Sequence, residues 1–259
     1  ADVVDIMLCV DVSGSMAAQD FETRGARRNR LEVTKEAVRD FIASRKHKPQ
    51  DRYGLDRLGL ILYAGYAWTQ CPLTLDYGVL ERELDLAAID ERDPRKQGTA
   101  IGSAIGLAVS RLRKSEADTK VIILLTDGLN NAGELNPITA ANLANEYNTR
   151  IYTIGAGSQE EVLVPRRSLW GNVMMPAQMP IDEDTLQKIT DITGGRFYRA
   201  TDTKSLVGAY EEINQLEATE IEIGDYYEYE EGFFPYAVLG GLLMLAAVFM
   251  RRMWFEPIP

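Results

Sequence analysis

Apolar runs typical of buried strands alternate along this chain with stretches whose apolar residues recur at helical spacing. The first run covers residues 3–12, and the most hydrophobic, 120–126, contains the uninterrupted sequence Val-Ile-Ile-Leu-Leu. Residues 58–64 and 67–73 predict two strands joined by a tight turn at Gly65 and Tyr66. Two shorter strands are expected further along, at 150–155 and 197–198.

Amphipathic segments between these runs predict helices. Residues 31–44 place nearly all their apolar side chains on one stripe. Comparable patterns occur at 80–88, 101–112, 138–147, 184–193 and 206–216, and the Gly194-Gly195 pair ends the fifth of these helices. Residues 158–180, rich in proline and methionine, read as an irregular excursion with room for a small hairpin. Regular alternation of strand and helix predicts a doubly wound α/β fold with a mostly parallel sheet.

The end of the chain differs from the α/β pattern and divides it into four parts. We expect one domain over 1–216, an acidic and tyrosine-rich linker over 217–232, a transmembrane helix over 233–250 and a short tail over 251–259. The third part is uncharged, and as a helix it extends about 27 Å, close to the thickness of a bilayer core.

The orientation of this expected helix follows from its flanks. Arg251 and Arg252 follow it, whereas acidic residues precede it. Positive residues stay on the cytoplasmic side, so the domain is expected in the periplasm, anchored in a bacterial inner membrane. The chain starts abruptly at Ala1, so we expect further sequence before it, and upstream spans there would share in setting the topology.

Composition narrows the function classes. The net charge of −11 argues against nucleic-acid binding, which requires clustered lysine and arginine. The two cysteines, Cys9 and Cys71, are too few for a disulfide scaffold, and we expect two free, buried thiols. The only histidine, His47, stands in a basic turn, and the chain has neither a Gly-x-Ser-x-Gly elbow nor a P-loop. The sequence therefore predicts a protein that is not an enzyme.

Oxygen-bearing side chains occur at the ends of predicted strands and at the start of a predicted helix. Asp11, Ser13 and Ser15 follow the first strand, Asp127 follows the most hydrophobic one, and Thr99 precedes a helix. In an open parallel sheet, ligands bind beyond the carboxyl ends of the strands, so these groups are expected to converge. Two carboxylates and three hydroxyls suit a hard cation, with each carboxylate binding directly or through a coordinated water. We expect Mg²⁺, with Mn²⁺ or Ca²⁺ as alternatives.

This set of residues resembles the metal-ion-dependent adhesion site of von Willebrand factor A domains. The motif Asp-x-Ser-x-Ser at 11–15, Thr99 and Asp127 fill every motif position, and the resemblance covers about residues 3–216. It implies a six-stranded sheet in the order 3-2-1-4-5-6 with one antiparallel edge strand. Because so few of the expected ligands are negatively charged, the bound ion stays electrophilic and can accept one further carboxylate from a partner protein.

Further segments are similar to bacterial aerotolerance (Bat) membrane proteins, namely 69–74, 98–102, 124–133 and 193–200. This finer resemblance implies that the protein acts in a complex with other Bat-type membrane proteins and a MoxR-type AAA+ ATPase, and that this complex contributes to envelope stress tolerance. Two function classes stay open. One is a membrane-anchored module that captures a partner carboxylate through its metal, and the other is a structural scaffold in which the metal only stabilises the loops.

Overall fold

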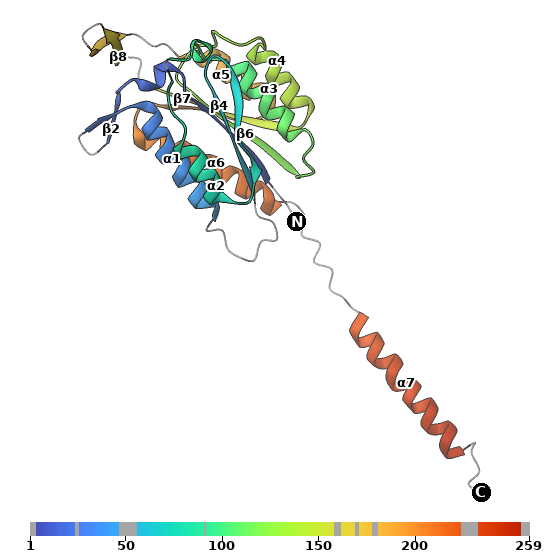
Figure 1. The fold of residues 1–259 in the computed structure, drawn as a ribbon. Helices are drawn as coiled ribbons and strands as arrows, with labels where there is room; N and C mark the ends of the chain where they lie inside the picture. Colours follow the sequence, from blue (N-terminus) through green and yellow to red (C-terminus); the bar gives the residue numbers. More distant parts are fainter. Residues whose placement is uncertain are drawn as a thin grey trace. The chain divides into compact units, whose positions relative to one another are not determined.

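The main sheet has six strands and contains the core of the molecule (Figure 1). The structure is a computed structural model, and it describes residues 4–23, 26–46, 56–90, 92–157, 162–168, 171–177, 181–223 and 233–254. The sheet runs β10-β7-β6-β1-β4-β5. Its strands are β1 (Val4–Asp11), β4 (Arg57–Tyr63), β5 (Ala67–Thr74), β6 (Thr119–Thr126), β7 (Thr149–Ala156) and β10 (Phe197–Ala200).

The arrangement of this sheet agrees with the fold class expected from the sequence. If these six strands are numbered one to six in chain order, they follow one another across the sheet from β5 to β10 as 3-2-1-4-5-6. Four neighbouring pairs are parallel, and only the edge strand β5 runs antiparallel to its neighbour β4. The strand labels depart from simple numbering because four further strands form two separate two-stranded sheets.

Helices cover both faces of the sheet. In Figure 1, α3 (Ile101–Leu112), α4 (Pro137–Glu146) and α5 (Glu183–Thr193) lie on one face, while α1 (Arg30–Lys46), α2 (Tyr77–Asp85) and α6 (Thr203–Ile223) lie on the other. Strand side chains alternate between these layers. Met7 and Cys9 of β1 belong to the cluster packed against α3, α4 and α5. Gly194, with φ of 73°, ends α5 as the sequence predicts.

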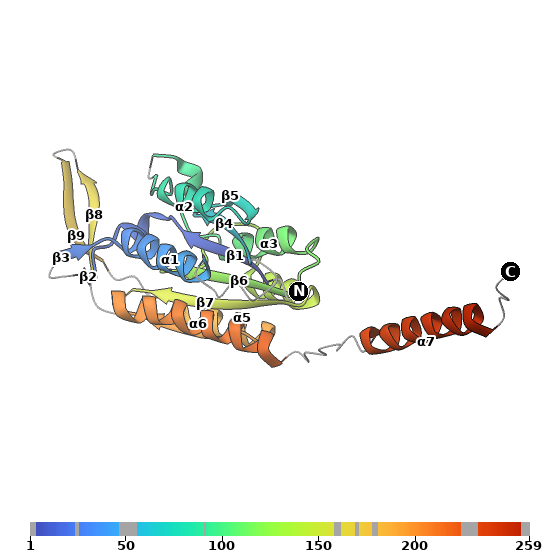
Figure 2. The ribbon, with the colours of Figure 1, turned by 90° about the horizontal axis from the view of Figure 1, so that it is seen from below.

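Two small hairpins add to the predicted elements. β2 (Phe21–Thr23) pairs with β3 (Ala26–Arg28) between β1 and α1, where the hydrophobic pattern predicts no strand. Phe21 is buried there and anchors that hairpin to the domain. β8 (Val162–Ser168) pairs with β9 (Gly171–Ala177), so the proline- and methionine-rich excursion does contain a hairpin. Both hairpins lie at the same end of the main sheet (Figure 2).

The last helix of the domain is longer than the sequence indicates. It continues past Leu216 to Ile223, into the segment expected to be an acidic linker. Glu217 is fully buried and accepts hydrogen bonds from Arg150 Nη1 at 2.8 Å and Tyr152 Oη at 2.5 Å. This glutamate therefore belongs to the core. The other predicted domain boundaries remain predictions.

A separate unit, Glu220–Pro259, contains α7 (Phe233–Trp254). Its described side chains, 238–251, are exposed, and most are large and apolar. Over the part of the chain that the structure describes, no helix meets the length and apolarity needed to cross a membrane. The transmembrane helix expected at 233–250 is thus not confirmed, although a helix is present there.

Candidate metal centre

The candidate site lies at the carboxyl ends of two central strands. β1 and β6 are parallel neighbours, with Val10 beside Leu125, so Asp11 and Thr126 end their strands at the same level. Asp127 follows directly. Both aspartates are completely buried, which is unusual for carboxylates and requires strong partners. The fold thus places two acidic groups 116 positions apart in sequence at one edge of the sheet.

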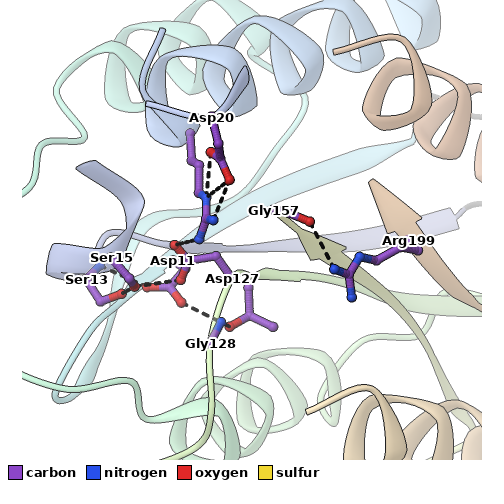
Figure 3. Close-up of polar contacts among 10 residues, drawn as sticks. Asp11, Ser13, Ser15, Asp20, Asp127, Gly128, Gly157 and Arg199 are labelled. Atoms are coloured by element: carbon purple, nitrogen blue, oxygen red, sulfur yellow. Dashed lines mark hydrogen bonds and ion pairs between the residues drawn. The ribbon is translucent and has the colours of Figure 1, made fainter. Parts of the chain in front are cut away.

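The loop after β1 connects these carboxylates through hydroxyl groups (Figure 3). The Ser13 backbone N–H donates to Asp11 Oδ1 at 2.8 Å, which turns the chain sharply at the end of the strand. Ser13 Oγ lies 2.9 Å from Ser15 Oγ, and Ser15 Oγ donates to Asp127 Oδ1 at 2.6 Å. The short helix η1 (Gly14–Ala17) begins here, and the Ser13 side chain makes no capping bond to it, which leaves that hydroxyl available to the site.

Thr99 reaches the site from a different loop, two residues before α3. Its N–H donates to Asn131 Oδ1 at 2.8 Å, and its carbonyl accepts from the Asn131 N–H at 3.1 Å. A methyl group built on Gly128 would lie 3.9 Å from Thr99 Oγ1, so the threonine hydroxyl is next to the Asp127-Gly128 turn. All five residues predicted from the sequence are therefore in one region, and Asn131 fixes the Thr99 loop.

Arg30, which no sequence motif singles out, is an ionic partner of Asp127. This first residue of α1 is completely buried, and its Nη1 donates to Asp127 Oδ2 at 2.9 Å. Its Nε and Nη2 donate to Asp20 at 2.9 and 2.5 Å (Figure 3). A methyl group on Gly157 would lie 2.6 Å from the guanidinium carbon, so only glycine allows this close packing.

Asp11 has no cationic partner of this kind within the described contacts. Its Oδ2 accepts a hydrogen bond from Thr126 Oγ1 at 3.0 Å. Burial, and secondarily the nearby charge of Asp127, raises the pKa of Asp11 to about 7. Burial also raises the pKa of Asp127, although Arg30 acts in the opposite direction. When ionised, Asp11, Asp20, Asp127 and Arg30 together carry a formal charge of −2, which one divalent cation would balance.

A cavity of about 640 Å³ opens above these groups. Ser13, Ser15 and Thr99 line it, together with Asn131, Lys96 and Asp90, whereas neither Asp11 nor Asp127 does. The three hydroxyl-bearing residues therefore border the open space, although Ser13 and Thr99 are themselves buried, and neither carboxylate reaches it. Among the described residues, no cluster of three or more His, Cys, Asp or Glu side chains suits a metal, so any ion here depends on hydroxyl oxygens. An oxygen-only set of two carboxylates and three hydroxyls fits a hard divalent cation.

A comparison with protein families matches residues 5–212 to the von Willebrand factor type A domain. The chain belongs to this family. An uncharacterized protein of Borreliella burgdorferi is 31% identical to it over 255 residues, which cover 98% of this chain and 70% of that protein.

Two solved structures connect this family member with aerotolerance proteins. BatB from Bacteroides thetaiotaomicron, described as a conserved hypothetical protein, superposes with a TM-score of 0.66 at 28% identity, covering 83% of this chain and 99% of that one. An aerotolerance-related membrane protein from Bacteroides fragilis gives 0.65 at 28% identity, with coverages of 82% and 97%. The Bat-like resemblance predicted from the sequence is therefore confirmed.

A more distant fold relative is proximal thread matrix protein 1 of the mussel byssus, described with a zinc-occupied MIDAS motif. It superposes with a TM-score of 0.59 at 20% identity, covering 83% of this chain and 45% of that one. At this identity, the likeness supports the fold of this chain.

Proposed function

We propose that Asp11, Ser13, Ser15, Thr99 and Asp127 bind one divalent cation, through which this domain captures a carboxylate of a partner protein. One observation carries the proposal: two fully buried carboxylates approach each other beside hydroxyl-bearing residues that border a cavity. Arg30 offsets only part of the buried negative charge, and burial raises the pKa of both acids, so further positive charge would stabilise the site. A divalent cation provides that charge.

The geometry divides the roles of these residues. The hydroxyls of Ser13, Ser15 and Thr99 line the cavity and would be direct ligands. Asp127 already accepts Ser15 on one oxygen and Arg30 on the other, and it would act mainly by orienting a ligand or a coordinated water. Neutral ligands leave a bound cation strongly electrophilic, so it retains affinity for one external carboxylate.

Mg²⁺ is the ion we propose, because it is small, prefers oxygen ligands and keeps several of its waters. Mn²⁺ has similar preferences, while Ca²⁺ takes more ligands at longer distances. Zinc in the site of the distant mussel relative is a further divalent ion to include in any titration.

We place this function at a bacterial envelope, as part of a complex with Bat-type membrane proteins and a MoxR-type ATPase. The membrane part of the proposal rests on the Bacteroides fragilis relative, described as a membrane protein, and on the exposed apolar side chains of α7, such as Met244 at 74%. A periplasmic orientation rests on Arg251 and Arg252 after the apolar segment. A cysteine-accessibility assay that placed the domain in the cytoplasm would refute that orientation.

The alternative function is a structural scaffold in which the cation only stabilises the three loops that contain residues 11–15, Thr99 and Asp127. We propose no catalytic role, because the site offers no histidine base and no nucleotide-binding loop. Turnover of generic esters by the purified protein would contradict this and indicate a hydrolase. The buried hydrogen bonds between the two loops are compatible with the scaffold, so partner capture has to be tested directly.

Thr99→Ala separates the two functions, since it removes one ligand oxygen and no charge. Ser110→Ala, an exposed hydroxyl on α3, is the matched control. The full chain is used for affinity capture from membranes, with and without chelator, while Mg²⁺ binding is followed by calorimetry. Capture lost in Thr99→Ala and in chelator, with the fold retained, supports adhesion. Capture unchanged in both supports the scaffold.

A further inference from the structure

A second cavity adjoins the one above the metal centre. This neighbour, of about 500 Å³, is lined by Tyr66, Trp68 and Leu86 on its far side. The two cavities share three lining residues, Ile89, Asp90 and Lys96. The groove, defined as these two adjoining cavities, has Ser13, Ser15 and Thr99 at one end and the rings of Tyr66 and Trp68, the aromatic wall, at the other.

The aromatic wall is built on the edge of the sheet. Tyr66, in the turn before β5, and Trp68, near the start of β5, have ring centroids 5.1 Å apart at an angle of 39°. Trp68 Nε1 donates to Gln70 Oε1 at 3.0 Å, which fixes the indole orientation. Leu86 is 70% exposed beside these rings. The wall is therefore a preformed apolar surface that remains open to solvent.

A cation stands where the two cavities meet. Lys96 Nζ lies 5.2 Å from the Trp68 ring centroid and 3.5 Å from Asp90 Oδ2. Lys96 belongs to the short helix η2 (Pro94–Lys96), which packs tightly on the β4–β5 turn. A methyl group on Gly65 would lie 2.3 Å from the Arg95 carbonyl oxygen and 2.4 Å from that of Gln97. This close approach holds the lysine in place between the hydroxyls and the rings.

We propose that this groove binds an extended segment of a partner protein carrying an acidic side chain and, within a few residues, an aromatic or large aliphatic side chain. The acidic side chain occupies the metal end, and the apolar one packs against Trp68, Tyr66 and Leu86. Lys96 lies between them with its charge offset by Asp90, so the preference for an acidic side chain comes from the bound cation. The inference rests on the proposed function, because the acidic half requires the bound cation.

Because the two cavities share lining residues, one extended segment can reach both ends of the groove. The cation at one end selects an acidic side chain, and the rings at the other end select an apolar one. An acidic residue without an apolar neighbour would use only the metal end and leave the aromatic wall exposed. Burying one aromatic side chain there is expected to tighten binding at least about tenfold. A second copy of this chain is the competing occupant, and it would reveal itself as self-association sensitive to Trp68.

The test uses the full chain with Mg²⁺ and short labelled synthetic peptides in a fluorescence anisotropy titration. Each peptide has one glutamate, followed after one to four residues by phenylalanine or by alanine, on a Gly-Ser background. Phenylalanine should improve binding at least about tenfold at the best spacing. Trp68→Ala and Leu86→Ala should remove most of that gain without altering Mg²⁺ affinity by calorimetry. Leu75→Ala, an exposed leucine outside the groove, is the control.

Three results would overturn the inference. In the first, phenylalanine gives no gain at any spacing while the glutamate still binds with Mg²⁺, so the metal function stands and the aromatic wall plays no part. In the second, the phenylalanine gain survives chelator and the exchange of glutamate for glutamine, so the apolar side chain binds independently of the metal and the two ends do not form one site; glutamate binding that does not depend on Mg²⁺ would instead contradict the metal-site function. In the third, sedimentation shows a dimer abolished by Trp68→Ala and the peptides bind without discrimination.

Discussion

The buried guanidinium of Arg30 provides a sharp test of the electrostatics of this site. Arg30→Met retains a long apolar side chain but removes the charge that contacts both Asp127 and Asp20. Arg30 and Asp127 are 0% exposed and the Asp20 side chain 7%, so water cannot replace the lost partner. Breaking a buried ion pair from one side costs about 3–5 kcal/mol. For a domain of this size, each kcal/mol lowers Tm by about 2–4 °C, which gives a decrease of about 6–20 °C.

The response to Mg²⁺ distinguishes charge balance from simple packing. If the dication offsets the same buried carboxylates, Mg²⁺ should stabilise Arg30→Met more than the wild type, and the gap in Tm between them should narrow. Differential scanning calorimetry at saturating Mg²⁺ and in chelator measures both values. The double variant Asp20→Asn/Arg30→Met, which restores the formal charge of the wild-type cluster, should recover a wild-type Mg²⁺ response. A wild type that responds to Mg²⁺ beside an Arg30→Met variant that does not would refute this reasoning.

Three further predictions concern the same region. Asp11→Asn should stabilise the metal-free protein at pH 8 by up to about 4 kcal/mol in urea unfolding, because the pKa of this buried acid is about 7 instead of 3.8 and its ionisation is costly. The same substitution should abolish the stabilisation by Mg²⁺. An unchanged Mg²⁺ effect would exclude Asp11 from the site. In the wild type, between pH 3.8 and about 7, Asp11 keeps its proton in the folded chain but loses it in the unfolded chain. The Tm of the metal-free wild type should therefore fall as pH rises through this window, while its affinity for Mg²⁺ rises. A flat Tm profile would contradict the raised pKa of Asp11. Gly157→Ala should lower Tm by several degrees, because φ is 142° there and the new Cβ would lie 2.6 Å from the guanidinium carbon of Arg30. Gly208→Ala, on α6 where a Cβ meets open space, is the control and should leave Tm unchanged or slightly higher. Equal effects of the two substitutions would contradict the close packing on Arg30.

Local sequence patterns were sufficient for the parts of the fold that depend on periodicity. The aliphatic run before Asp127 predicts one strand end, and the Asp-x-Ser-x-Ser motif predicts the end of the first strand and the loop that follows it. Both features are defined by residues that are neighbours in sequence. Sheet order and the convergence of Thr99 with Asp11 came from the family resemblance and from the rule for parallel strand ends. The antiparallel edge strand β5 was expected on the same basis.

Features fixed by distant contacts could not be read in this way. Arg30 follows Arg27, Arg28 and Asn29, a run that resembles a solvated surface, and its burial depends on Asp127, 97 positions away. Glu217 stands among other acidic residues, yet Arg150 and Tyr152 bring it into the core. The groove likewise requires that β5 and the η2 segment be adjacent, which no local pattern indicates.

The central claim is that one divalent cation binds the hydroxyls at this end of the sheet and keeps a position open for an outside carboxylate. Anomalous diffraction from crystals of the protein soaked in Mn²⁺ tests it most directly. The account predicts a single strong peak about 2.0–2.6 Å from the hydroxyl oxygens of Ser13 and Ser15, with a water or an external carboxylate completing the coordination. A peak elsewhere in the molecule, or an ion whose last position is filled by one of the chain's own carboxylates, would contradict it.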